Sequence, residues 1–117
     1  MPGTLTTEVI DTERDCAAAG LRVTLYALTG EGRVAINMGE IGIDGQGTEP
    51  LLPEDNYAPG IYEIVFHAGD YQSGQGAQPK FINTIPVRFE LDETCHNHLV
   101  LSLASTGYSV AAQITAA

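Results

Sequence analysis

The chain has few cysteines and few basic residues, and both shortages restrict what it can be. Its 117 residues contain two cysteines, Cys16 and Cys95, and five lysines and arginines against fifteen acidic residues. Two cysteines are too few for a disulfide scaffold or a cysteine-based zinc site, so we expect buried or idle thiols. The formal net charge of −10 argues against nucleic acid and anionic membranes as partners, because no basic surface is available to neutralise phosphates.

Long apolar runs are also missing. None approaches the roughly twenty residues that a membrane-spanning helix needs. The Met-Pro-Gly-Thr start lacks a basic region followed by an apolar segment, so it does not resemble a signal peptide. We therefore expect a cytoplasmic protein. A length of 117 residues with 44% hydrophobic content fits one domain, residues 1–117, with a real core.

Apolar and polar residues alternate with a period of two along much of the chain, which predicts β-strands. Asp44-Gly45 is typical of a tight turn, and Pro86 predicts an edge strand or a bulge. Residues 67–79 are rich in Gly, Gln, Asp and Ser, so we expect a loop with at most one short helix. The strands are predicted over residues 5–10, 21–28, 34–43 (as one or two short strands), 61–66, 81–91, 95–103 and 108–114.

Short strands separated by turns, without a helical period, predict an all-β fold: a two-sheet antiparallel sandwich. The strand over 95–103 carries two of the three histidines, His96 and His98. Alternation places both on the face opposite Leu99 and Leu101, which need a core. The same alternation places Glu8 on the polar face of the first strand.

Several short segments occur in an order that resembles one protein family. They are Val9-Ile10-Asp11-Thr12 with Ala18-Ala19-Gly20-Leu21-Arg22-Val23-Thr24-Leu25-Tyr26, then Asp44-Gly45, Pro59-Gly60-Ile61-Tyr62, Ile85-Pro86-Val87, and finally His96-Asn97-His98-Leu99-Val100-Leu101-Ser102 followed by Tyr108-Ser109. Together they resemble the transthyretin and 5-hydroxyisourate hydrolase family. The histidine segment is similar to the family's His-x-His-x-Pro-Leu-Leu-Leu-Ser. The resemblance covers nearly the whole chain.

This resemblance implies a small two-sheet sandwich that pairs into dimers and then into a homotetramer. Ligand or active sites would lie in the channel where the dimers face each other. In the hydrolases the site combines a His on the first strand, an Arg after the Asp-Gly turn, the second His of the late strand and a C-terminal Tyr-Arg-Gly-Ser. The reaction adds water and opens an oxidised, urate-derived ring. No cofactor or metal is implied.

The chain departs from the hydrolase pattern at most of these positions. Glu8 stands in place of the first His, and Gln46 in place of the Arg. The tail after Tyr108-Ser109 contains no Tyr-Arg-Gly-Ser, so His98 alone is retained. A carboxylate beside an imidazole favours the charged imidazole and can support acid–base chemistry. A Gln cannot neutralise an anionic substrate as an Arg would.

We therefore predict that Glu8 and His98 are catalytic. We predict that substrate is bound by Gln46, Tyr108, Ser109 and Gln113. The substrate is expected to be a small, neutral or cationic cyclic compound other than 5-hydroxyisourate, transformed by hydrolysis and ring opening or by a related lyase or isomerase step. The alternative is a non-catalytic, transthyretin-like module that binds a small ligand or only assembles.

The remaining histidines and Cys95 are expected to lie outside the catalytic site. His96 is predicted to be exposed or structural, and His67 to be solvated. A zinc site made of His96, His98 and Glu8 is conceivable chemically, but no second motif supports it. Cys95 is expected to face the core, where a thiol is usually inert.

Overall fold

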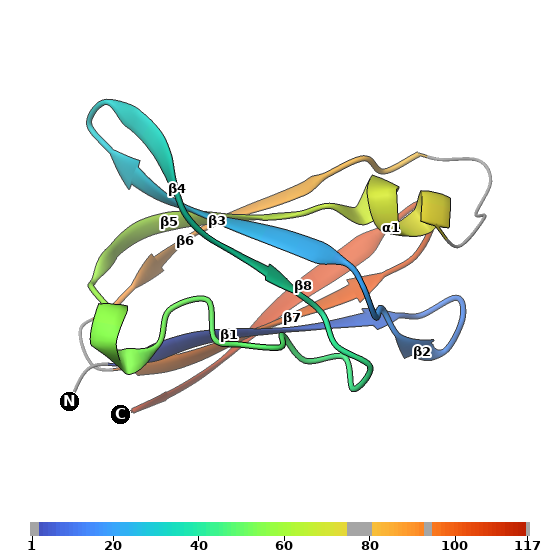
Figure 1. The fold of residues 1–117 in the computed structure, drawn as a ribbon, viewed down its shortest axis with the longest axis horizontal. Coiled ribbons are helices and arrows are strands. Elements are labelled where there is room, and N and C mark those ends of the chain that lie inside the picture. Colours follow the sequence, from blue (N-terminus) through green and yellow to red (C-terminus); the bar gives the residue numbers. More distant parts are fainter. Residues whose placement is uncertain (1–2, 75–80, 93–94, 117) are drawn as a thin grey trace.

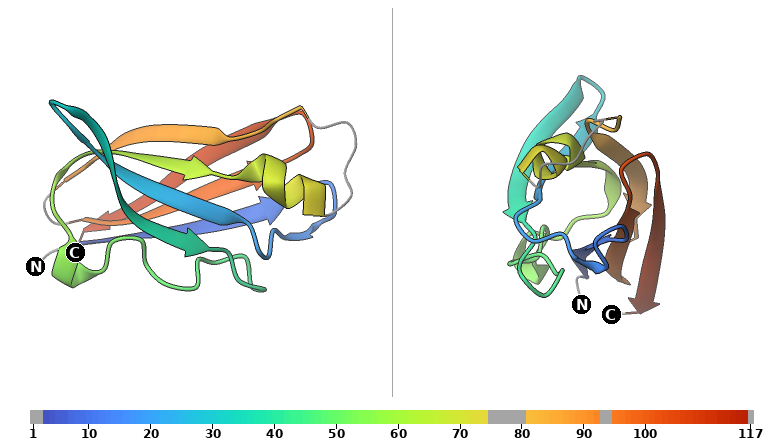
Figure 2. Two further views of the ribbon diagram at one scale, coloured as in Figure 1. Left: turned by 45° about the horizontal axis from the view of Figure 1, so that its top comes forward. Right: turned by 90° about the vertical axis from the view of Figure 1, so that its right-hand side faces the viewer.

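Two four-stranded sheets pack face to face in the computed structural model, which describes residues 3–74, 81–92 and 95–116 (Figure 1). Turning the molecule shows the two layers and the helix at one end (Figure 2). The elements are β1 (Thr4–Asp11), β2 (Cys16–Ala17), β3 (Arg22–Thr29), β4 (Gly32–Glu40), the 3₁₀ turn η1 (Glu54–Asn56), β5 (Gly60–Phe66), α1 (Ala68–Gly74), β6 (Ile85–Leu91), β7 (Cys95–Leu103) and β8 (Tyr108–Ala116).

The strand order is β2-β1-β7-β8 in the first sheet and β4-β3-β5-β6 in the second. The predicted all-β two-sheet sandwich is confirmed. One strand pair departs from the antiparallel expectation, because β1 and β7 are parallel, in register from Thr4↔His96 to Asp11↔Leu103. These strands lie at opposite ends of the sequence, so no hairpin fixes their relative direction. The other strand pairs among the described residues are antiparallel.

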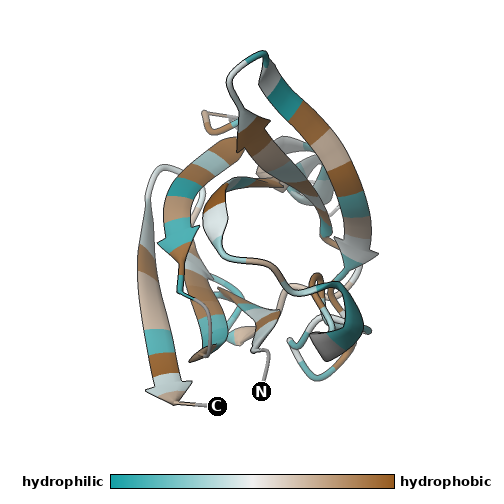
Figure 3. Ribbon diagram, turned by 90° about the vertical axis from the view of Figure 1, so that its left-hand side faces the viewer, coloured by the Kyte–Doolittle hydropathy of each residue, from teal (hydrophilic) through white to brown (hydrophobic). Residues whose placement is uncertain are grey.

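The core lies between the sheets and is built from the alternating positions that the sequence pattern indicated. Along β1 the buried residues are Leu5, Thr7, Val9 and Asp11, and hydrophobic and hydrophilic residues alternate along the strands (Figure 3). Burying one large apolar side chain stabilises the fold by about 1.5–3 kcal/mol. The largest fully buried side chains are those of Phe66, Leu5, Leu21, Leu25, Ile41, Leu51, Ile64, Ile85, Leu101 and Leu103.

Several predicted strand boundaries differ from the observed ones, in three strands by two residues or more. The strand predicted over 34–43 is a single strand, Gly32–Glu40, and Gly39 does not interrupt it, because Gly39 keeps its pairing with Val23 of β3. The strand predicted over 81–91 begins at Ile85, because β5 ends at its partner Phe66 and offers no backbone to the residues before it. The last strand continues to Ala116. Pro86 lies on the edge strand β6, as predicted.

The short helix α1 falls within the predicted 67–79 loop, of which residues 75–79 lie outside the described part. The Tyr71 hydroxyl donates a hydrogen bond of 2.8 Å to Asp11 Oδ2 and thereby ties α1 to the end of β1. Burial, with a contribution from Asp11, raises the pKa of Tyr71 to about 12. No helix among the described residues is long and apolar enough to cross a membrane.

Candidate functional site

Glu8 and His98 meet on the outer face of the first sheet. Nε2 of His98 lies 3.1 Å from Oε1 of Glu8, and Nδ1 lies 2.7 Å from Oγ1 of Thr6. The side chains of His98 and Glu8 are 23% and 26% exposed, so the pair is half-buried yet reachable from outside. The parallel register causes this contact, since it places His98 opposite Thr6 and leaves Glu8 two residues further along the same face.

The core holds these polar side chains in place. Leu5 and Val9 of β1 and Leu99 and Leu101 of β7 are buried between the sheets. Because strand side chains alternate, this packing turns Thr6, Glu8 and His98 outward from both strands. A one-residue slip of either strand would bury the charged residue and expose the leucines.

Gln46 lies beside Glu8, on the side of β1 away from β7. The two residues form an antiparallel bridge, and the turn before Gln46 is closed by a 3.0 Å hydrogen bond from its N–H to Asp44 Oδ1. Gly45 has φ +86°, a left-handed conformation that favours glycine. Its carbonyl accepts a hydrogen bond of 2.9 Å from the N–H of Val9, which anchors the turn to β1.

Gln113 on β8 pairs with His98 and Gln46 pairs with Glu8, so these four residues form a diagonal row on one face of the sheet, with Glu8 two residues beyond the Thr6–His98 pair. Tyr108 and Ser109 do not join this row. They pair with Leu103 and Ser102, and Ser102 is four residues from His98, or roughly 13 Å along the strand. Of the predicted site residues, the structure therefore brings four together and leaves these two at the far end of β8.

The tail of the chain runs beside β7 as part of β8 (Figure 1). All of β8 is exposed, including Tyr108, Val110 and Ile114, which are 50%, 36% and 62% exposed. On the His98 face the tail offers Gln113 and, two residues before it, the small side chain of Ala111. Within one chain the tail flanks the pair and does not cover it.

The other histidines and the cysteines lie elsewhere or have other partners. His96 Nδ1 is 2.9 Å from Thr4 Oγ1, and His67 Nε2 is 2.9 Å from Thr24 Oγ1 on the second sheet. Cys16 and Cys95 are free thiols, the first exposed and the second half-buried rather than turned fully into the core. No group of three or more His, Cys, Asp or Glu side chains in the described residues could hold a metal ion.

Positive charge gathers on the opposite sheet. Arg33 and Arg88 lie 3.1 Å and 3.9 Å from the buried carboxylate of Glu63, and the Arg33 guanidinium stacks 4.1 Å from the centre of the Tyr26 ring. These strands belong to the second sheet. Among the residues described, the row around Glu8 and His98 carries one carboxylate, one imidazole and two amides.

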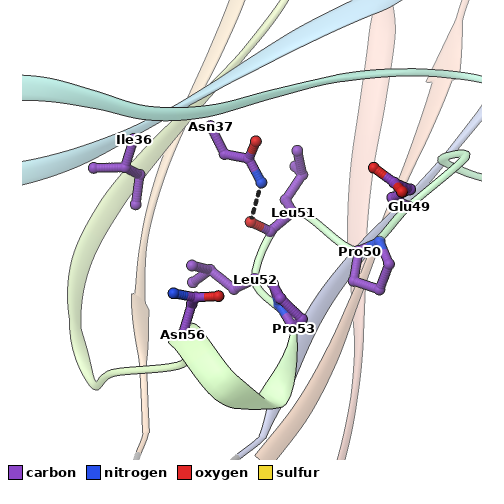
Figure 4. Close-up of a pocket in the computed structure, with 8 residues that line it drawn as sticks. All are labelled: Ile36, Asn37, Glu49, Pro50, Leu51, Leu52, Pro53 and Asn56. Atoms are coloured by element: carbon purple, nitrogen blue, oxygen red, sulfur yellow. Dashed lines mark hydrogen bonds between the residues drawn. The ribbon is translucent and has the colours of Figure 1, made fainter.

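A separate hollow of about 650 Å³ opens between β4 and the following loop (Figure 4). The amide of Asn37 donates a 2.8 Å hydrogen bond across it to the carbonyl of Leu51. The hollow contains none of the predicted site residues and no acid–base pair. Its lining consists of Ile36, Asn37, Glu49, Pro50, Leu51, Leu52, Pro53 and Asn56.

Thr6 is the site residue that sequence reasoning missed. Its signal was present as two alternating patterns, Thr4-x-Thr6-x-Glu8 and His96-x-His98. Only the parallel pairing of β1 with β7 shows that each histidine faces a threonine.

The fold and this row of side chains define a two-sheet sandwich of the transthyretin type. The family model "HIUase/Transthyretin family" matches residues 5–111. The chain belongs to this family, which confirms the resemblance found in its sequence.

Relatives and solved structures agree with this assignment. The chain is 40% identical over 110 residues to a 5-hydroxyisourate hydrolase of Mesorhizobium japonicum, covering 92% of this chain and 89% of the relative. It is also 40% identical to 5-hydroxyisourate hydrolase 2 of Rhizobium meliloti over 111 residues, covering 92% of each. An (S)-allantoin synthase structure matches with TM-score 0.84 and 28% identity over 96% of this chain, which spans 44% of that longer chain. Transthyretin from Sparus aurata shares the fold, with TM-score 0.88 and 22% identity over 97% of this chain and 98% of that chain.

Proposed function

We propose that the chain is a ring-opening hydrolase of this family that acts on a small cyclic compound other than 5-hydroxyisourate. The observation that carries the proposal is the 3.1 Å contact between Glu8 and His98 on a reachable face. Relatives named for hydrolysis of 5-hydroxyisourate, and a structural neighbour named for allantoin synthesis, support a small nitrogen heterocycle as substrate. A carboxylate–imidazole pair can take a proton from water and return it to the leaving group.

The charge of the site favours a neutral or cationic substrate. Glu8 brings a negative charge, and Gln46 and Gln113 on either side of the pair are uncharged. Amides both donate and accept hydrogen bonds, which suits the alternating N–H and C=O groups of a cyclic amide. Without a guanidinium in this row, an anionic ring would lie against a carboxylate with no compensating partner.

We further propose a cytoplasmic homotetramer, a dimer of dimers, whose channel encloses the site. In support, β8 is an edge strand with exposed apolar side chains, which is a surface suited to contact with another chain. The Glu8–His98 pair lies on an open sheet face, so a second chain is needed to enclose a substrate there. Ser109, which lies on the same face as His98, would then reach the substrate from another copy of the chain, with Tyr108 next to it at the end of β8. Light scattering gives the mass of the assembly directly, and a monomer would contradict this part of the proposal.

The test is a turnover screen with the purified full-length protein. Neutral and cationic five- and six-membered cyclic amides and ureides, with 5-hydroxyisourate for comparison, are followed by loss of ring absorbance. We expect one neutral or cationic ring to be opened, and His98→Ala and Glu8→Ala each to lower its turnover at least about 100-fold. His96→Ala is the matched control on the same face, and it should retain turnover. Unchanged turnover in both site variants would disprove the assignment of the site.

A non-catalytic binding module is the second candidate. The observation that favours it is the tail, where the residue opposite His98 is the uncharged amide Gln113 and Ala111 on the same face carries no functional group. This candidate predicts that a ring from the screen binds, detected by calorimetry, while its ring stays intact. Turnover that depends on Glu8 and His98 excludes it.

A further inference from the structure

The contacts of His98 determine which member of the pair can accept a proton. We infer that Thr6, His98 and Glu8 form an ordered hydrogen-bond chain in which Glu8 is the proton acceptor, while His98 and Thr6 are positioning residues. The catalytic part of this inference rests on the proposed function. The order of the hydrogen bonds does not, because it follows from the resting structure alone.

The carboxylate of Glu8 has no proton to donate, so the proton in its hydrogen bond must come from the ring. Nε2 of His98 lies 3.1 Å from Oε1 of Glu8 and therefore carries the N–H. A neutral imidazole has a single N–H, so Nδ1 carries the lone pair. The Thr6 hydroxyl, 2.7 Å from Nδ1, donates to it. The other acceptor of that hydroxyl, the Asn97 carbonyl, is 3.5 Å away.

This arrangement leaves the neutral imidazole without a free lone pair. Nδ1 is occupied by Thr6 and Nε2 holds its proton toward Glu8, so the ring cannot take a proton from substrate or water. Oε2 of Glu8 has no hydrogen-bond partner among the described residues, and the side chain is 26% exposed. Oε2 is therefore the open basic atom of the site.

The resulting step balances as an ordinary hydrolysis. A water molecule gives a proton to Oε2 of Glu8 while its oxygen forms a bond to the ring carbonyl carbon. The C–N bond of the ring then breaks, and the proton on Oε2 passes to the departing nitrogen. Throughout the step, Nε2–H of His98 stays bonded to Oε1 and holds the carboxylate in place. The sequence predicts Glu8 and His98 together as a catalytic acid–base pair, and the order of the hydrogen bonds divides the two roles between them.

His96 supplies a natural comparison. Its Nδ1 lies 2.9 Å from Thr4 Oγ1. This contact repeats the one between His98 and Thr6, two residues earlier on both β1 and β7. None of the described carboxylates lies within hydrogen-bond distance of its Nε2. The Thr4–His96 pair is thus the same threonine–histidine contact without a carboxylate, and Thr4 provides the control position for the second test below.

The first test is a pair of glutamine substitutions, assayed on the ring that the screen identifies. Glu8→Gln keeps an oxygen that accepts from His98 but removes the proton acceptor, so kcat should fall about 10²–10⁴-fold. His98→Gln keeps an N–H that can donate to Glu8, so kcat should fall no more than about 10-fold. A larger loss in His98→Gln than in Glu8→Gln, or equal losses, would overturn the assignment. Unchanged turnover in both variants would instead refute the proposed site itself.

The second test needs no substrate. Long-range ¹H–¹⁵N spectra of the imidazoles, with His98 assigned by its loss in His98→Gln, report the tautomer of the neutral ring. We expect a protonated Nε2 and a hydrogen-bonded, unprotonated Nδ1. Thr6→Val should shift the Nδ1 resonance toward that of a free ring nitrogen, Thr6→Ser should restore it, and Thr4→Val should leave His98 unchanged. A protonated Nδ1 in the neutral wild-type ring would refute the inference even if the protein is an active hydrolase.

Discussion

The contact between Glu8 and His98 should be measurable as a coupling energy in the stability of the protein. We propose a double-mutant cycle of wild type, Glu8→Ala, His98→Ala and the double variant, unfolded with urea at neutral pH. If the contact forms in solution, the two single losses will not add up to the loss of the double variant.

The size of the coupling follows from the geometry and the burial of the pair. Fully exposed ion pairs contribute about 0–1 kcal/mol, and hydrogen bonds to charged groups about 1.5–3 kcal/mol. At 3.1 Å, with side chains 23% and 26% exposed, the pair lies between these cases. We therefore expect a coupling energy of about 1 kcal/mol, the upper end of the range for exposed pairs, because solvent still screens both groups.

A matched cycle with Glu8→Ala and His96→Ala gives the control. His96 pairs with Thr4, four residues before Glu8 on β1, so the two side chains are separated by roughly 13 Å along the strand. Their effects should add within about 0.3–0.5 kcal/mol. A Glu8–His98 coupling no larger than this control would mean that the contact makes no net contribution, and the proposed pair would lose its physical basis.

Other predictions concern α1. Because burial raises the pKa of Tyr71 to about 12 from 10.0, the stability from its neutral phenol is fully present below pH 10 and is lost as the pH rises through 12. Urea unfolding should show a loss on the order of 2 kcal/mol across this window, and the loss should be absent in Tyr71→Phe. Gly69→Ala should cost about 1–3 kcal/mol in the same assay, because its Cβ would lie 2.7 Å from Asn83 Oδ1. Gly74→Ala, where no described residue outside the helix backbone and the adjacent residues lies within 4 Å of the new Cβ, should instead stabilise by about 0.4–1 kcal/mol. Equal effects at the two glycines would contradict the packing described for α1.

Alternation along the chain predicted the sandwich and the faces of its strands, because burial repeats every second residue in a strand. Leu99, Leu101 and Leu103 are buried, and His98 lies outside, as their positions indicate. Strand ends were less predictable, since a strand ends where the neighbouring strand no longer offers backbone groups for hydrogen bonding. Ile85 begins β6 because β5 ends at Phe66, and nothing in residues 81–84 themselves encodes this limit.

The contact between Glu8 and His98 required more than a face pattern. Alternation indicated that both side chains point outward, but their meeting depends on the parallel register of β1 and β7. The two residues are ninety positions apart in the sequence, and no local signal sets that register. For the same reason the role of Thr6 was invisible, and Tyr108 and Ser109 could not be recognised as distant from the pair within one chain.

The central claim is that this site acts on a neutral or cationic ring in preference to 5-hydroxyisourate, for which its relatives are named. It is tested most directly by measuring kcat/KM for 5-hydroxyisourate on this protein and on the Mesorhizobium japonicum hydrolase, side by side. The resemblance places an Arg in the hydrolases where this chain has Gln46, and losing a charged contact to substrate costs about 2–5 kcal/mol. We predict a value at least about 30-fold lower for this protein, with a neutral or cationic ring preferred to 5-hydroxyisourate. Equal values for the two proteins would contradict the account.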